Sequence, residues 1–494
     1  MTQSAPASSA LSPHEIRSII IGVLVAMFLA ALDQTIVATA MPTIGRVLGD
    51  FENLPWVVTI YLLTSTAVTP LYGKMADIAG RRVTLLVAIG TFVAGSSLCA
   101  LAPTMLTLIL ARALQGLGGG GLISLAQTII ADIIPPRERA RYQAYFATVF
   151  VSSSIAGPVL GGFMAEKLHW SVIFWINLPL GLLAFWMTNS VLRKLPRHER
   201  PHRLDFLGSG LMAVATIALL LALSLGGPHY AWTSAPILGL FGLSALFWIA
   251  FVIRLRTAPE PLIPTEILAN PVVAAGTIAA CFGMGVFIGM TIYMPILLEG
   301  IYGLTASQSG LALIPMMVGT VTGATLSGRL MARITHYKRP PLIGLAVSTV
   351  CFGLIAINPQ ALPLAVLEIL LTAASLGIGT MLPVTTVAIQ NAVLQHQMGT
   401  ATGAMNFFRS LGGALIVAVF GAIVMGGLPA DLAANVTIET LAKSIAAAGS
   451  DIGSVFRWVF LAAAFGSLAT LCALLRMEER PLRTKVEPAS MAME

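Results

Sequence analysis

The sequence predicts an all-α polytopic membrane protein, in which two six-helix bundles and two extra central helices make fourteen transmembrane helices. Three observations predict it: a composition poor in charge, a series of long uncharged windows, and basic residues gathered on one side of those windows. Of the 494 residues, 57% are hydrophobic and 10% are charged. Soluble domains carry about 25% charged residues, so this chain cannot cover itself in water, and lipid is the alternative.

The uncharged windows place the helices, because about 20 apolar residues cross a bilayer once. One window, 206–253, is long enough for two crossings, which separate at the turn sequence Gly226-Gly227-Pro228-His229-Tyr230. We predict helices at 17–41, 53–75, 82–101, 105–131, 140–163, 170–192, 204–225, 235–254, 271–298, 308–332, 340–357, 362–390, 399–425 and 455–476.

The basic residues orient the chain. With the N-terminus in the cytoplasm, 22 of the 28 lysines and arginines fall on the cytoplasmic side, as the positive-inside rule requires. Two more, Arg112 and Arg409, fall within helices, and an odd number of helices would destroy this distribution. We therefore expect a multi-pass protein of the cell inner (plasma) membrane with both termini in the cytoplasm.

A weak internal repeat divides the helices. The stretch 73–82 resembles 328–339 at an offset of about 255 residues, and 115–118 resembles 375–379 at about 260. Two similar offsets indicate two parallel six-helix halves. We predict a disordered cytoplasmic tail (1–16), an N-terminal bundle (17–192), a basic linker with two extra helices (193–257), a C-terminal bundle (258–477) and a cytoplasmic tail (478–494).

Several functional classes are disfavoured. The four cysteines lie far apart in apolar stretches, which suits packing rather than a metal site or a disulfide set. The chain contains no Gly-x4-Gly-Lys-Ser/Thr phosphate loop and no His-Glu-x2-His metal motif. We expect no catalytic residues, no metal and no cofactor. The basic residues lie in short loops between apolar runs, which argues against nucleic acid as a partner.

The first half carries a series of known motifs. They are Leu32-Asp33-Gln34-Thr35-Ile36-Val37 through Met41-Pro42, the loop 73–82 (Gly-Lys-Met-Ala-Asp-Ile-Ala-Gly-Arg-Arg), Arg112-Ala113-Leu114-Gln115-Gly116-Leu117-Gly118-Gly119-Gly120, Gly157-Pro158-Val159-Leu160-Gly161-Gly162, and Trp175-Ile176-Asn177-Leu178-Pro179-Leu180-Gly181. In this order, and with two extra central helices, the chain resembles the major facilitator superfamily, specifically its fourteen-helix drug:proton antiporter family.

The resemblance implies roles for two of these motifs. The loop 73–82 would be a gate, in which Asp77 meets the end of a neighbouring helix; the candidate gating residues are Gly73, Lys74, Asp77, Gly80, Arg81 and Arg82. A simple positive-inside anchor is the alternative. The second copy of the loop has Ala332 in place of an acid, so any such latch is expected to be asymmetric. The candidate antiporter hinge is Gly157, Pro158, Gly161 and Gly162, for which close helix packing is the alternative.

Three ionisable residues are predicted to lie in the hydrocarbon, where a charge costs at least ~2.5–3.5 kcal/mol and usually serves function. On the predicted spans, Asp33, Arg112 and Glu368 all lie roughly 10–12 Å below the outer surface. Equal depth suggests a shared polar cavity, in which the acids could carry protons. The resemblance implies proton coupling for Asp33 and Arg112, whereas Glu368 rests on physics alone and could be an interhelix pair. Glu299 is a weaker candidate because it could reach the outer interface.

These features predict a secondary exporter driven by the proton gradient, which moves small hydrophobic or amphiphilic compounds such as drugs by alternating access. Its cavity would be lined by the helices at 17–41 and 105–131 and the Met/Phe-rich stretch 281–294, with one or two acids. Export of an endogenous metabolite or siderophore is the alternative substrate assignment. A membrane-embedded enzyme or a non-transporting receptor is the alternative of another class. The expected partners are a small-molecule substrate, protons and membrane lipid; the sequence leaves the oligomeric state and any accessory export partner open.

Overall fold

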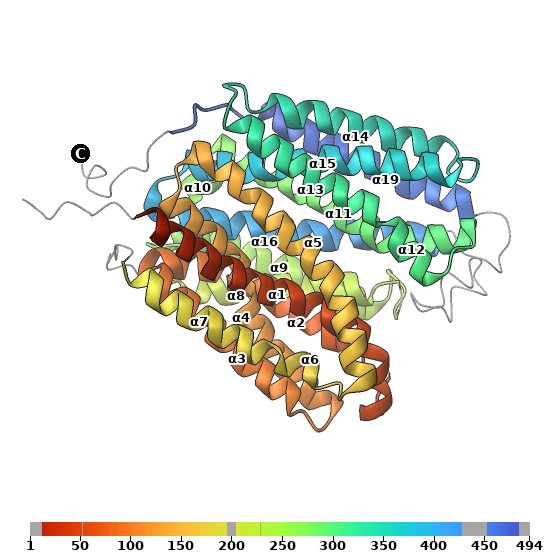
Figure 1. Ribbon diagram of the computed structural model, residues 1–494, viewed down its shortest axis with the longest axis horizontal. Helices are drawn as coiled ribbons and strands as arrows, with labels where there is room; N and C mark the ends of the chain where they lie inside the picture. Colours follow the sequence, from red (N-terminus) through yellow and green to blue (C-terminus); the bar gives the residue numbers. More distant parts are fainter. Residues whose placement is uncertain (1–11, 52, 195–203, 228, 427–451, 484–494) are drawn as a thin grey trace, which may run out of the picture.

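The computed structural model describes residues 12–51, 53–194, 204–227, 229–426 and 452–483. Most of the predicted tails 1–16 and 478–494, and much of the basic linker at 195–203, lie outside the described residues. Within them the chain is all-helical, and its long helices lie side by side (Figure 1). In the described part of the chain, thirteen helices are long and apolar enough to cross a membrane. A further 24-residue helix, Trp56–Ala79, is more polar and brings the long helices to fourteen.

The first six predicted crossings are helical. They are α1 (Pro13–Leu48), α2 (Trp56–Ala79), α3 (Arg81–Ala100), α4 (Met105–Ile133), α5 (Pro136–Lys167), and the pair α6 (Val172–Trp175) and α7 (Asn177–Val191), which a short 3-10 turn (Leu192–Lys194) follows. The sixth crossing is broken at Ile176. Pro179 explains the break, because it lacks the N–H that would bond to the carbonyl of Trp175.

The remaining eight crossings also correspond to the prediction. They are α8 (Phe206–Leu225), α9 (Ala235–Thr257), α11 (Pro271–Tyr302), α12 (Ala306–Ala312) with α13 (Ile314–Met331), α14 (Arg339–Ile357), α15 (Leu364–Ala392), α16 (Met398–Gly426) and α19 (Ile452–Arg476), with the short α10 (Thr265–Ala269) before α11 and a 3-10 turn (Gln395–Gln397) before α16. Pro315 lies in the first turn of α13, where a proline fits the start of a helix.

Two sets of helices pack in the same pattern. In the first set α1 contacts α5 and α7, α4 contacts α2 and α3, and α3 contacts α7. In the second set α11 contacts α16 and α19, α15 contacts α13 and α14, and α14 contacts α19. Helix for helix, α1, α2, α3, α4, α5 and α7 correspond to α11, α13, α14, α15, α16 and α19. The two sets occupy opposite sides of the molecule (Figure 1).

The sets meet along two corresponding seams. The α2–α16 seam and the α5–α13 seam join equivalent helices of the two sets. The remaining pair, α8 and α9, packs on itself and reaches the rest mainly through α8, which contacts α2 and α16. Its apolar cluster includes Leu63 of α2, Met212 and Leu220 of α8, and Phe407 of α16. The extra pair therefore covers the α2–α16 seam.

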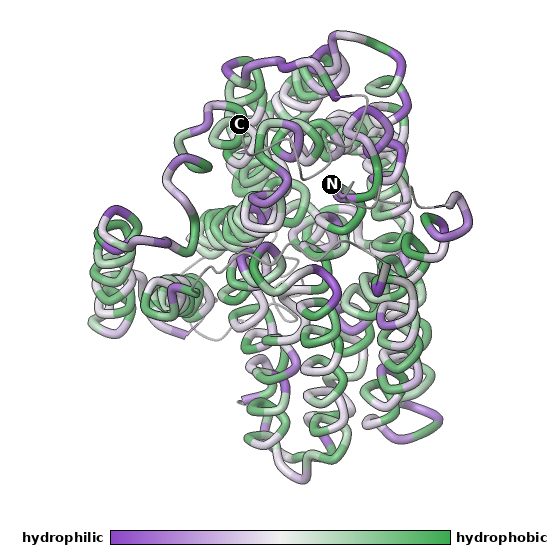
Figure 2. The backbone as a smooth tube through the Cα atoms, turned by 90° about the vertical axis from the view of Figure 1, so that its left-hand side faces the viewer, coloured by the Kyte–Doolittle hydropathy of each residue, from purple (hydrophilic) through white to green (hydrophobic). Residues whose placement is uncertain are grey.

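Both ends of the described chain lie at one end of the bundle, where α1 begins and α19 ends (Figure 1). This end also holds the α2–α3, α4–α5 and α13–α14 connections, which carry the basic clusters; we call it the basic end. Viewed from that end, the helices are largely apolar and the hydrophilic colour gathers at chain ends and connections (Figure 2). This distribution is that of a multi-pass membrane protein.

Candidate functional site

A buried ion pair lies inside the first helix set. Arg112 Nη1 of α4 donates to Asp33 Oδ2 of α1 at 2.5 Å. Asp33 is 0% and Arg112 is 1% exposed. The other Asp33 oxygen, Oδ1, accepts from Gln115 Nε2 at 2.8 Å and from Asn177 Nδ2 at 2.9 Å. Both carboxylate oxygens are therefore satisfied, as a buried charge requires.

Arg112 has partners besides Asp33. Its Nε donates to the Val57 carbonyl at 3.0 Å, and its Nη1 also donates to Gln115 Oε1 at 2.7 Å. The Tyr61 ring lies 4.3 Å from the guanidinium carbon, a cation–π distance. Gly116 lets α2 approach closely, because a Cβ there would collide with the Thr64 hydroxyl and the Tyr61 carbonyl. The arginine is thus held from α2 and α4 as well as from α1.

The structure corrects the predicted shared cavity. Glu368 lies on α15 in the second helix set and is partly exposed, whereas Asp33 and Arg112 are enclosed in the first set. The partners of Asp33 among the described residues are Arg112, Gln115 and Asn177, and Glu368 is not one of them. Equal depth along separate helices does not bring side chains together. Glu299 is also partly exposed, and it lies three residues before α11 ends at Tyr302.

Asp33 also lies deeper in the helix bundle than predicted, because α1 is longer than predicted. The predicted first helix ended at 41, but α1 continues to Leu48. Asp33 therefore lies about 22 Å from the far end of its helix, at 1.5 Å per residue, and close to the middle of α1. Pro42 lies inside α1 without ending it.

A cavity of about 640 Å³ lies between the two helix sets. Helices α2 and α4 form one wall, α11 and α16 form the opposite wall, and α8 with the turn after it closes a side. The predicted lining from 281–294 is present in Met284, Ile288, Ile292 and Tyr293, and Gln34 of α1 also contributes. Trp232, Thr59 and Met425 extend the lining to the end opposite the basic end.

The cavity wall corrects a second prediction. We expected one or two acids, but the described lining residues include no Asp or Glu. Asp33 is turned into the first helix set, and its neighbour Gln34 is the residue that faces the cavity. One charged side chain does line the cavity, Arg409 of α16. The sequence places Arg409 within a helix and assigns it no role.

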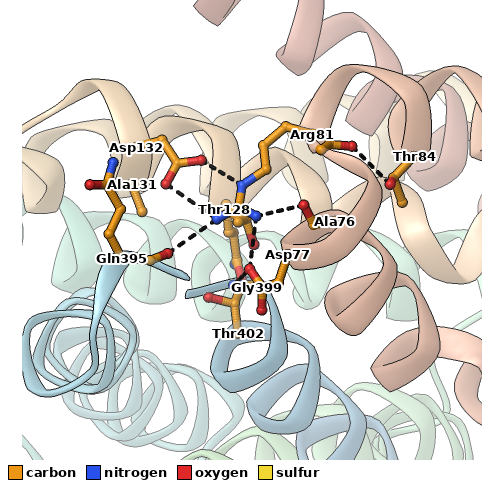
Figure 3. Close-up of polar contacts among 12 residues, drawn as sticks. Ala76, Asp77, Arg81, Thr84, Thr128, Ala131, Asp132, Gln395, Gly399 and Thr402 are labelled. Atoms are coloured by element: carbon orange, nitrogen blue, oxygen red, sulfur yellow. Dashed lines mark hydrogen bonds and ion pairs between the residues drawn. The ribbon is translucent and has the colours of Figure 1, made fainter. Parts of the chain in front are cut away.

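The basic end is closed beneath the cavity by Asp77. Asp77 Oδ1 accepts from the Gly399 N–H at 2.9 Å, and Oδ2 accepts from the N–H and the hydroxyl of Thr400, both at 2.7 Å. These donors belong to the first turn of α16, where a helix N-terminus favours a negative charge. Arg81 Nη1 donates to Asp77 Oδ1 at 2.8 Å. We call these four residues the Asp77 latch; Figure 3 shows Asp77 and Arg81 facing Gly399.

Arg81 ties the latch to two further elements. Its Nε donates to Asp132 Oδ2 of α4 at 2.7 Å, and its Nη2 donates to the Gln395 carbonyl at 3.3 Å (Figure 3). Gly80 makes the turn that places Arg81, with a φ of 87° that favours glycine. Gly73 lets the helices touch, because a Cβ there would collide with the Gly399 carbonyl.

The other two predicted gating residues stand apart from the latch contacts. Arg82 Nη2 donates to Asn189 Oδ1 of α7 at 2.5 Å, inside the first helix set. Lys74 is 9% exposed on α2.

The predicted hinge residues of α5 divide into two kinds. Cβ atoms at Gly157 and Gly161 would collide with Thr35 and Thr39 of α1, whereas nothing lies within 4 Å of a Cβ at Gly162. The Thr35 hydroxyl also donates to the Ser153 carbonyl at 2.9 Å. Pro158 lies inside α5 and is exposed. Gly157 and Gly161 therefore permit close packing of α1 and α5 beside Asp33, and Gly162 has no such contact.

Sequence reasoning missed Gln115 and Asn177 as site residues. Both lie inside the motifs at 112–120 and 175–181, and Gln115 follows Arg112 by three residues, which places it on the same helix face. Polar amides in apolar helices were the signal that could have identified them.

Comparison with known proteins places this fold in a family. The family model described as Major Facilitator Superfamily matches residues 23–417. The chain belongs to the major facilitator superfamily. A multidrug transporter protein (MdtP) of Bacillus subtilis (strain 168) is 35% identical over 409 residues, covering 82% of this chain and 75% of that one. Multidrug resistance protein 3 of the same organism is 34% identical over 407 residues, covering 82% and 79%.

A solved structure agrees with the fold. The proton:xylose symporter XylE has a TM-score of 0.62 at 14% identity and covers 96% of this chain and 98% of its own. The likeness shows the fold alone. As a member of the major facilitator superfamily the chain is a multi-pass membrane transporter of small molecules, and not an enzyme.

Proposed function

We propose that this transporter is a proton-coupled exporter of hydrophobic or amphiphilic compounds such as drugs. The observation that carries the proposal is the buried Asp33–Arg112 pair, whose neighbour Gln34 lines the central cavity. The relatives named as multidrug transporter and multidrug resistance proteins support the substrate class. The positive-inside rule favours a cytoplasmic basic end, and the proposed location is the cell inner (plasma) membrane.

Asp33 is the proposed proton carrier. Protonation would remove the charge that holds Arg112 Nη1, but Arg112 keeps the Val57 carbonyl, the Gln115 amide oxygen and the Tyr61 ring as partners. Loss of the ion pair therefore leaves no wholly unpaired arginine in the bundle, which lowers the cost of protonation. A proton on Asp33 loosens α1 from α4, and release of that proton restores the pair.

The two ends of the cavity differ, which suits transport by alternating access. In this conformation the cavity reaches the end opposite the basic end, and the Asp77 latch closes the basic end. With the basic end inside, this is the outward-facing state. Substrate would leave from it, and protons would enter. Opening of the latch would then turn the cavity toward the cytoplasm by rocking the two helix sets.

Proton-driven export in everted vesicles tests the proposal. Asp33→Asn keeps the shape of the side chain but cannot ionise, so we expect export driven by an imposed pH gradient to fall at least tenfold while the protein is still inserted. Glu166→Gln is the matched control, because Glu166 is an exposed acid on α5; its export should equal wild type. Normal pH-driven export by Asp33→Asn would refute the assignment.

The choice of substrate is tested by the same vesicles. A panel of cationic, neutral and anionic amphiphiles, with siderophores and metabolites added, would be screened while a proton reporter follows each addition. Compounds whose entry dissipates the pH gradient are substrates. A response restricted to a metabolite or siderophore would replace the drug-exporter assignment.

A further inference from the structure

The cavity contains a cation with few partners. Arg409 lies on α16, and among the described lining residues it is the single Asp, Glu, Lys, Arg or His. A charge in the hydrocarbon region costs at least ~2.5–3.5 kcal/mol. Such a residue is retained for a partner or a function, so the contacts of Arg409 decide its role.

Those contacts leave the guanidinium largely unpaired. Its Nη1 donates to Asn406 Oδ1 at 3.3 Å, and its Nε is buried without a hydrogen-bond partner. Within the described residues no carboxylate forms an ion pair with it. Arg112, by comparison, is paired with Asp33 and also donates to Val57 and Gln115. The protein neutralises Arg112 with a carboxylate and leaves Arg409 facing the cavity without one.

Asn406 holds the arginine in place rather than neutralising it. Its amide nitrogen donates to Gln127 Oε1 at 2.8 Å and to the Thr402 carbonyl at 3.0 Å, which fixes its oxygen toward Arg409. Gln390 donates to the Gln127 carbonyl and to the Thr402 hydroxyl. Asn406 lines the cavity, and the other neutral amides and hydroxyls support it from behind. They position a positive charge without supplying a negative one.

We propose that the cavity binds amphiphilic anions, with a sulfonate, carboxylate or phenolate group on Arg409 and an apolar body along the neighbouring surface of α11 and Trp232. The inference rests on the proposed function in treating this cavity as the substrate site. Met284, Ile288 and Trp232 offer the apolar surface, and Ser410 is a further polar lining residue beside the arginine. Arginine pairs with such oxyanions by charge-assisted hydrogen bonds. A cationic amphiphile would meet repulsion at the same position.

Equilibrium binding of a matched pair of fluorescent probes tests the inference. The anion 8-anilinonaphthalene-1-sulfonate and the neutral N-phenyl-1-naphthylamine share one aromatic skeleton and differ by the sulfonate. Each is titrated into full-length protein in nanodiscs of zwitterionic lipid, and the signal of empty nanodiscs is subtracted. No proton gradient is present, so the result is independent of whether Asp33 couples transport to protons.

Arg409→Gln should weaken binding of the sulfonate probe roughly tenfold or more, the equivalent of one charge-assisted contact. Binding of the neutral probe should change less than twofold. Asn406→Asp is a second variant that keeps Arg409 and places a carboxylate where its amide partner stood; it should weaken sulfonate binding in the same way. Arg457→Gln on α19 is the control, because it removes an exposed arginine outside the cavity lining; it should change neither probe.

Two results would overturn the inference. One is equal loss of both probes in Arg409→Gln and Asn406→Asp, which would make the arginine a structural element of the cavity wall. The other is unchanged sulfonate binding in both variants. Either result leaves proton-driven export intact, whereas failure of the Asp33→Asn test leaves the probe selectivity intact, so the two proposals fail separately.

Discussion

The two seams between the helix sets use equivalent helices but differ in chemistry. At the α2–α16 seam, the Asp77 carboxylate accepts three hydrogen bonds from Gly399 and Thr400 and an ion pair from Arg81. At the α5–α13 seam, the position corresponding to Asp77 is Ala332, and the polar contact is an exposed hydrogen bond from Arg137 Nε to the Ala332 carbonyl at 3.1 Å.

What the seams share is close backbone packing. A Cβ at Gly73 would collide with the Gly399 carbonyl, and a Cβ at Gly328 would collide with the Ala140 carbonyl. Glycine contact is thus common to both seams, while the buried charge is present at one. We infer that packing permits closure of the basic end, and that the Asp77 latch supplies most of the free energy that holds it closed.

Asp77→Asn should have the largest effect on this comparison. The amide would point an N–H₂ group at donors that now meet a carboxylate, and breaking such a buried charge network costs roughly 3–5 kcal/mol. We expect export to fall more than tenfold and the basic end to open. Spin labels at the exposed residues Ala79 and Leu394, on either side of the α2–α16 seam, would report the opening as a longer distance.

The control for this variant is Glu138→Gln, which removes an exposed acid at the same end. It should leave the label distance and the export rate unchanged. An Asp77→Asn protein that keeps the wild-type distance would show that packing alone closes the seam.

The second prediction tests the shared packing. Gly73→Val and Gly328→Val should each force the seam apart, because overpacking costs about 1–3 kcal/mol, and each should lower export threefold to tenfold. Gly90→Val on α3 and Gly353→Val on α14 are matched controls, since nothing lies within 4 Å of a Cβ at either position. The measurement is the export rate in the same vesicles. If Gly73→Val lowers this rate and Gly328→Val does not, close packing at the α5–α13 seam is not needed for transport.

The fold was largely predictable and the site was not, for a physical reason. Lipid imposes one strong rule, that each crossing be apolar and helical, so the fourteen spans could be predicted from charge-free windows. These include the pair α8 and α9, which the turn beginning at Gly226 separates. Which faces of separate helices meet depends on rotation and tilt, which hydropathy does not encode. Asp33 and Arg112 belong to neighbouring helices and pair, while Glu368 at a similar predicted depth lies in the other set.

The absence of an acid at position 332 was visible in the sequence, and its consequence was predictable as an asymmetric latch. What could not be predicted was the partner of Asp77. Gly399 and Thr400 are unremarkable in sequence, and they matter because the first turn of α16 presents free N–H groups. The role of Arg409 could not be predicted from the sequence for the same reason. Its importance lies in the lack of a counter-charge among the described cavity-lining residues, and that lining is known only from the structure.

The smallest predicted effects come from rebuilding the second seam. Ala332→Asp would offer Arg137 a carboxylate at an exposed end of α13, where surface ion pairs contribute ~0.2–1 kcal/mol and a helix C-terminus disfavours the acid. The basic end should therefore close slightly more firmly, and export should slow about twofold. Arg137→Gln alone should change export less than twofold, since it removes one exposed bond to a carbonyl. In the double variant the slowing of export caused by Ala332→Asp should disappear, because the new acid has lost its cation. This non-additive result would show that the slowing depends on pairing of the new acid with Arg137. Slowing that persists without Arg137 would mean that the acid acts through a different partner, and the α5–α13 seam would then hold a latch of its own.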